Sequence, residues 1–214
     1  MVTIHLPPPQ RPISPVSWPL PAGSPLVRIF DPTDHNQTAT GFRFAGPFKR
    51  FDHHRRLGQR WDDPERGIFY TAPSLEACLV EVFGDNNDGS IEPEERHVAF
   101  ITTARELHLL DLRGTGRNNG AWKAGSVEAL SKNGEYAPSQ AWSRYFYENP
   151  DRYSLVDGLI YSNAHNGDDA IALYERANDA ITCPVDQVLR LDDADLRPLL
   201  IEAALSTGLT PPTS

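Results

Sequence analysis

The stretch GIFYTAPSLEACLVEVFG, residues 67–84, predicts a strand that leads directly into a helix. Residues 67–72 are mostly β-branched or aromatic, which is typical of a short buried strand. Ser74 follows a proline and is a good N-cap, and Gly84 is a common helix end. The apolar residues between them recur at i, i+3, i+4 and i+7, namely Leu75, Cys78, Leu79 and Val82. The stretch therefore predicts a helix that ends near residue 83 and lays one face on a core.

Similar patterns extend outward from this unit in both directions. They predict further strands at residues 26–30, 97–103, 107–112, 156–162, 169–175 and 187–191. They predict helices near residues 127–132 and 139–147, and a last helix capped by Asp192 or Asp193 with an apolar stripe of Leu196, Leu199, Leu200 and Ala203. Since strands dominate and the helices are irregularly interspersed, we expect an α+β domain with a mixed β-sheet core and flanking helices.

Two segments do not read as regular structure. Residues 1–25 contain eight prolines, which remove backbone donors, so they predict an extended N-terminal arm before a single domain at 26–214. Residues 31–66 are rich in Asp, His, Arg and Gly with little periodicity. A loop of that length within a compact domain is usually functional or partly mobile.

The composition excludes several classes of protein. The 20 Lys and Arg against 29 Asp and Glu give a net charge of −9, so we expect no direct nucleic-acid binding through an overall positive field. A nucleotide ligand would have to be held by a few local groups. No apolar stretch approaches the roughly 18 residues that span a bilayer, and the N-terminus lacks the apolar core of a signal peptide. The sequence favours a soluble cytoplasmic protein with no membrane partner, in which Cys78 and Cys183 are buried thiols.

Metal sites and the common hydrolase motifs are not indicated. His53 and His54 are adjacent and would point apart, which predicts a solvated loop rather than a ligand pair. The segment 84–95 has calcium-loop residues but lacks the leading acidic ligand. Glu76 and Glu81 lie about 140° apart around a helix at ~100° per residue, so at most one of them enters a given pocket. We therefore expect no bound metal.

Five residues remain as candidates for a site: Arg28, Arg60 within Gly58-Gln59-Arg60-Trp61, Tyr70, Glu81 and Ser162. Each also has an ordinary structural explanation, such as an edge strand, a core aromatic or a solvated helix residue. Their spacing alone does not decide between the two.

The order and context of these residues resemble the RES domain, the toxin module of Xre–RES toxin–antitoxin pairs. In that family an early strand Arg precedes a G-x-R-W turn, a Y-x-A-x-S-x-E-x-A-x-x-E block and a G-x-x-Y-x-S strand. These patterns are similar to Arg28, residues 58–61, Tyr70 to Glu81, and Gly158 to Ser162. The resemblance covers roughly residues 26–190. Two departures are Asp62 in place of the family's Asn, and the lack of a basic residue directly after Ser162.

The resemblance implies a fold similar to ADP-ribosyltransferases and an enzyme that destroys NAD⁺ by breaking its nicotinamide–ribose bond. It implies NAD⁺ as substrate rather than cofactor, and an Xre-like antitoxin protein as partner. It makes Glu81 and Arg28 the expected catalytic residues, with Tyr70, Ser162 and Arg60 binding the substrate. These residue types suit the chemistry, because a carboxylate stabilises an oxocarbenium-like ribose and guanidinium groups bind phosphates.

Several alternatives stay open at this level. The acceptor is water in a glycohydrolase, inorganic phosphate in a phosphorylase, or a side chain in a protein ADP-ribosyltransferase. The domain is alternatively a non-catalytic nucleotide-binding or interaction module. The basic cluster at residues 53–56 would attract phosphate or form a solvated loop. The sequence gives no oligomeric state.

Overall fold

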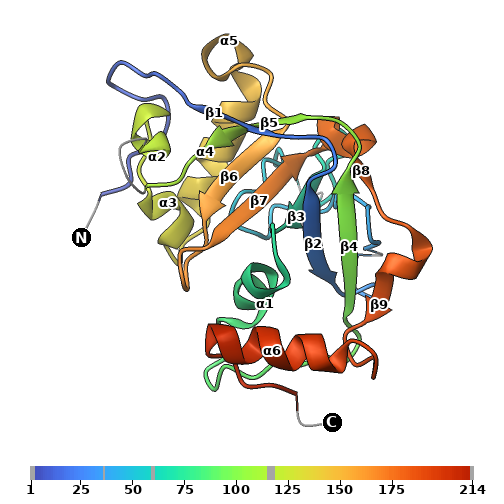
Figure 1. Cartoon of the computed structure of the whole chain (residues 1–214). Coiled ribbons are helices and arrows are strands. Elements are labelled where there is room, and N and C mark those ends of the chain that lie inside the picture. The colour runs from blue at the N-terminus through green and yellow to red at the C-terminus, as the bar shows by residue number, and fades with distance from the viewer. Residues whose placement is uncertain (1–2, 36, 59–60, 115–118, 213–214) are drawn as a thin grey trace.

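The computed structural model describes residues 3–35, 37–58, 61–114 and 119–212, and it contains two β-sheets (Figure 1). The five-stranded sheet has the spatial order β1 (Ser17–Leu20), β5 (Leu107–Asp111), β6 (Gly158–Ser162), β7 (Asp169–Tyr174) and β3 (Ile68–Thr71). The second sheet joins β2 (Pro25–Phe30), β4 (His97–Thr103) and β8 (Ile181–Thr182), and β9 (Val188–Arg190) also pairs with β4. β5 and β6 run parallel and the other paired strands run antiparallel, so the first sheet is mixed.

Helices flank both sheets (Figure 1). The helices are α1 (Leu75–Phe83), α2 (Gly120–Lys123), α3 (Ala129–Lys132), α4 (Ala137–Glu148), α5 (Pro150–Tyr153) and α6 (Arg197–Thr207), with 3₁₀ turns at Glu175–Ala180 and Val185–Gln187. This arrangement confirms the predicted α+β class with a mixed sheet and flanking helices. No helix in the described ranges is both long and apolar enough to cross a lipid bilayer.

Strand alternation sorts the core into three layers, because successive side chains point to opposite faces of a sheet. Between the two sheets lie Leu26 and Phe30 of β2, Ile101 of β4, Phe69 of β3, Ile160 of β6 and Ile171 of β7. The opposite face of the five-stranded sheet packs on α2–α5 through residues such as Leu159, Tyr161, Trp142 and Phe146. The opposite face of the second sheet packs on α1 and α6 through residues such as Val27, Val98, Leu79 and Leu200.

The strand and helix predicted for residues 67–84 are confirmed by β3 and α1. The Ser74 side chain accepts a hydrogen bond from the Ala77 N–H at 3.2 Å, as an N-cap should. The helix ends at Gly84, whose missing Cβ leaves room for the ring of His165. α1 therefore begins and ends where the sequence places it, and this fixes the direction of every side chain on it.

The two ends of the chain differ in part from expectation. The proline-rich segment contributes the edge strand β1, in which Trp18 pairs with Leu109 of β5. The predicted cap of the last helix is wrong, because α6 begins at Arg197 with Pro198 in its first turn and has no side-chain cap. Leu199 is 45% exposed, so it lies outside the buried stripe of that helix.

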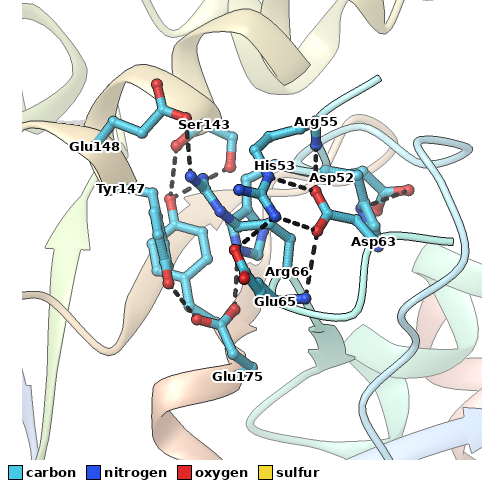
Figure 2. A network of polar contacts seen from close by, with 12 residues as sticks. Asp52, His53, Arg55, Asp63, Glu65, Arg66, Ser143, Tyr147, Glu148 and Glu175 are labelled. Atoms are coloured by element: carbon cyan, nitrogen blue, oxygen red, sulfur yellow. Dashed lines mark hydrogen bonds and ion pairs between the residues drawn. The ribbon is translucent and has the colours of Figure 1, made fainter. Parts of the chain in front are cut away.

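The prediction of a solvated loop at His53 and His54 is also wrong, because both rings are fully buried. The His53 Nε2 atom lies 3.0 Å from a Glu175 carboxylate oxygen, and Tyr147 donates to the other oxygen of that carboxylate (Figure 2). Burial lowers the pKa of both histidines, to about 4 for His54. Burial thus favours the neutral form of both histidines, which lie within the long loop.

Arg55 is not free to attract phosphate, contrary to one of the two interpretations left open above. Its guanidinium binds the buried carboxylate of Asp63 at 2.8 Å and that of Glu65 at 2.7 Å (Figure 2). The charge of Arg55 is therefore balanced by two neighbouring carboxylates.

Candidate functional site

A cavity of about 280 Å³ opens where the end of β2, the segment 31–50, α1 and the start of α4 meet. Its lining carries both signs of charge: the cationic side chains are Arg43, Lys49, Arg50 and Arg96, and the carboxylates are Asp31, Asp34, Glu81 and Asp85. Ile29, Phe30, Gln37, Tyr70, Val82, Tyr136, Ala164 and His165 complete it. The cavity thus contains as many cationic side chains as carboxylates, in a chain whose net charge is −9.

Glu81 lines this cavity from the second turn of α1. The hydroxyl of Tyr161 on β6, a fully buried residue, donates to Glu81 Oε1 at 3.4 Å. Burial raises the pKa of Glu81, and the positive charge of Arg50 opposes this shift. The carboxyl group therefore lies in a partly dry, cation-bearing hollow, as the chemistry inferred from the resemblance requires.

Tyr70 lines the same cavity from β3 and is held there by Asp52. The Tyr70 hydroxyl donates to Asp52 Oδ1 at 2.9 Å and accepts from the Phe51 N–H at 2.9 Å. Burial raises the pKa of Tyr70 well above its usual value, so the phenol stays protonated at neutral pH. The position of the ring is fixed because its hydroxyl group both donates and accepts a hydrogen bond.

Asp52 is the centre of a buried clamp. Its carboxylate receives two hydrogen bonds from Arg43 Nη2, at 2.7 and 2.9 Å, and one each from the backbone N–H groups of Phe48 at 2.6 Å and Lys49 at 3.0 Å. Together with the bond from Tyr70, these contacts tie the segment 43–52 to β3. This is how an irregular loop presents Lys49 and Arg50 to the cavity.

Arg50 is a lining residue that the sequence analysis missed. It donates to the carbonyl of Asn133, and its guanidinium carbon lies 4.9 Å from the centroid of the Tyr136 ring. One feature of the sequence could have pointed to Arg50. The tripeptide Arg50-Phe51-Asp52 has the same order of basic, aromatic and acidic residues as Arg60-Trp61-Asp62, where Arg60 was selected as a candidate. Phe51 is fully buried, and its ring centroid is 4.6 Å from that of Tyr161.

Arg28 lies behind the cavity rather than on its wall. The side chain is 4% exposed and donates to Gln37 Oε1 at 2.7 Å and to the Gly41 carbonyl at 3.1 Å. Its guanidinium carbon lies 4.2 Å from the Phe69 ring centroid, and burial lowers its pKa to about 10. Arg28 therefore holds Gln37, which does line the cavity.

Ser162 is not among the residues that line the cavity either. Ser162 is buried at the end of β6, two residues before the lining residue Ala164. The missing basic residue after it has a structural explanation, because Asn163 Oδ1 accepts from the backbone N–H groups of His165, Asn166 and Gly167 and shapes the turn. Arg60 lies outside the described residues. Among the residues that are described, no group of three or more His, Cys, Asp or Glu side chains is arranged to hold a metal ion.

Comparison with known proteins gives one family. The chain matches the RES domain model over residues 25–194. It is similar to a chain in the crystal structure of the M. tuberculosis MbcT–MbcA toxin–antitoxin complex, with a TM-score of 0.49 and 16% sequence identity over 82% of this chain and 85% of that chain. No curated protein matches it. Because the family model spans most of the 214 residues, including β2, β3, α1 and β6, the chain belongs to the RES domain family.

Proposed function

We propose that this protein cleaves the bond between nicotinamide and ribose in NAD⁺. The observation that carries the proposal is the position of Glu81, whose carboxyl group shares a cavity with Lys49, Arg50, Arg96 and Tyr70. The Glu81 carboxylate suits a sugar that develops positive charge, and the neighbouring Lys49, Arg50 and Arg96 suit the two negative phosphates. The RES resemblance supports the same substrate.

The proposed reaction begins with heterolysis of the C1′–N bond. The bonding electron pair leaves with nicotinamide, which becomes neutral, and the ribose acquires oxocarbenium character. The Glu81 carboxylate stabilises this charge, and it does so more strongly in a partly dry cavity than in bulk water. Water or phosphate then attacks C1′ and gives up a proton, which Glu81 or solvent takes. Tyr161 keeps the carboxylate oriented through its hydrogen bond.

The cationic residues are proposed to bind the pyrophosphate. Lys49 and Arg50 reach the cavity from the clamped segment, and Arg96, which precedes β4, also lines it. Arg28 and Ser162 stay predictions as direct substrate contacts. In this structure Arg28 acts through Gln37, which would have to move before the guanidinium met a phosphate.

The first test is to incubate the purified protein with NAD⁺ and follow free nicotinamide by chromatography. The proposal expects release of nicotinamide with equal loss of NAD⁺. Mass spectrometry of the partner product distinguishes the acceptor: ADP-ribose indicates water, its 1″-phosphate indicates phosphate, and mass added to a protein indicates a transferase. Saturable NAD⁺ binding without any turnover would instead support a non-catalytic binding module.

The raised pKa of Glu81 predicts the acid limb of the pH–rate profile. Protonation removes the negative charge that the oxocarbenium ion needs, so kcat/KM is expected to fall as the pH drops through the pKa of this residue. Because burial raises that pKa, the limb should lie above the ordinary glutamate value of 4.5. A pH series of nicotinamide release checks this, and a rate that stays constant down to pH 4.5 would contradict it.

We further propose that the chain acts as a toxin whose antitoxin is an Xre-like protein, as the family resemblance implies. Induced expression in a bacterial host should then arrest growth and deplete cellular NAD⁺. Expression of an inactive Glu81 variant to the same level should do neither. Growth arrest with an unchanged NAD⁺ pool would argue for a different target.

A further inference from the structure

The cavity that contains Glu81 is small for a whole dinucleotide. Its volume is about 280 Å³, just below the roughly 300–1,000 Å³ that is usual for small-molecule sites. NAD⁺ consists of two nucleosides joined by a pyrophosphate. If the nicotinamide ribose occupies the cavity beside Glu81, the adenosine half must continue onto the surrounding surface.

A column of three aromatic rings, here called the aromatic stack, stands on that surface. It consists of His35, Phe48 and Trp61. The ring centroids of His35 and Phe48 are 5.1 Å apart at an interplanar angle of 12°, and those of Phe48 and Trp61 are 5.5 Å apart at 24°. Trp61 is 65% exposed. One face of its indole packs on Phe48, so the opposite face is open to solvent.

The aromatic stack is continuous with the cavity wall. The Arg43 guanidinium carbon lies 5.5 Å from the Phe48 ring centroid, and Arg43 itself lines the cavity. Lys49, the next residue after Phe48, is also a lining residue. Asp34, the residue before His35, lines the same cavity. The aromatic stack is therefore adjacent in sequence to two lining residues, Asp34 and Lys49, and it contacts a third, Arg43.

The backbone around Trp61 is fixed. Ala45 and Asp62 form an antiparallel bridge, and the Gly46 N–H donates to the Trp61 carbonyl. Arg43, in turn, donates to the Ala45 carbonyl and is clamped by Asp52. The backbone of Trp61 is thus hydrogen-bonded to the same segment, residues 43–52, that presents Lys49 and Arg50. The exposed indole is thus available to stack on a flat group of a ligand.

We propose that Trp61 is the adenine-binding residue, and that the purine base of the dinucleotide stacks on its open face. The proposal rests on the proposed function for the identity of the ligand. A purine offers a flat π-face of matching size, and base–aromatic stacking is favourable without requiring hydrogen bonds to the base. Lys49, between the aromatic stack and Glu81, is then placed to meet the pyrophosphate.

Binding of ADP-ribose, measured by calorimetry, tests this without any turnover. Trp61→Ala is expected to weaken binding roughly tenfold, and Trp61→Phe, which keeps a flat ring, should restore most of it. Trp122→Ala is the matched control, because Trp122 is also exposed, at 54%, but stacks under Arg11 at α2. Circular dichroism confirms that each variant is folded.

Steady-state kinetics of nicotinamide release provide a second test. With NAD⁺, Trp61→Ala should raise KM roughly tenfold and leave kcat within about a factor of two. With nicotinamide mononucleotide, which lacks the adenosine half, the variant should behave as the wild type does. Unchanged ADP-ribose affinity in Trp61→Ala, equal losses in Trp122→Ala, or failure of the wild type to bind ADP-ribose would each overturn the proposal.

The two arms separate this inference from the proposed function. Nicotinamide release with a KM that is independent of Trp61 would leave the reaction standing and remove the adenine site. Trp61-dependent binding of ADP-ribose without nicotinamide release would support the adenine site and contradict the proposed reaction.

Discussion

Glu81→Gln is expected to lower kcat for nicotinamide release from NAD⁺ by about 10²- to 10³-fold, with little change in KM. Glutamine keeps the size of the side chain and can still accept from the Tyr161 hydroxyl, but it carries no negative charge. Only the stabilisation of the oxocarbenium-like ribose is lost. Since that charge appears in the transition state and not in bound NAD⁺, the effect should fall on kcat.

Glu76→Gln is the matched control on the same helix. Glu76 lies about 140° away from Glu81 at ~100° per residue and is not among the residues that line the cavity. Its replacement should leave kcat within about a factor of two of the wild-type value, because a change outside the cavity leaves transition-state contacts intact. Equal activities of the Glu81→Gln variant and the wild type would show that the carboxyl group takes no part in the reaction.

Asp52→Asn is expected to cost about 3–5 kcal/mol of unfolding free energy, the usual cost of removing one partner of a buried ion pair. Five donor contacts converge on this carboxylate, two from Arg43 and one each from Phe48, Lys49 and Tyr70. An asparagine has only one acceptor oxygen, and its NH₂ group would face the N–H and O–H groups that now donate to the carboxylate. Arg43 would also be left with its charge buried and unpaired.

Urea denaturation followed by circular dichroism measures this cost, with a constant m-value indicating that stability alone has changed. Asp151→Asn is the control, because Asp151 is exposed on α5. Its unfolding free energy should stay within about 0.5 kcal/mol of the wild type. If Asp52→Asn is as stable as Asp151→Asn, the clamp does not hold the segment 43–52.

The elements governed by local sequence could be predicted. The helix from Leu75 to Phe83 follows from its apolar spacing, its cap at Ser74 and its end at Gly84. Helical geometry shows that Glu76 and Glu81 face different directions, but the choice of Glu81 and Tyr70 as site residues came from the family resemblance.

The long loop could not be predicted in this way, because its structure depends on partners far along the chain. His53 packs against Glu175, Tyr147 and Tyr174, which lie some ninety or more residues away in sequence. Arg50 reaches the cavity because Asp52 is clamped by Arg43 and Tyr70. Such contacts leave no periodic pattern, so a charged loop and a folded active-site segment look alike in sequence.

The most direct test of the proposed reaction is a crystal structure of the Glu81→Gln variant with intact NAD⁺. We expect the nicotinamide ribose in the cavity, with its 2′-hydroxyl within hydrogen-bond distance of residue 81 and the pyrophosphate against Lys49 and Arg50. A dinucleotide bound elsewhere, or bound with its nicotinamide ribose directed away from residue 81, would contradict it.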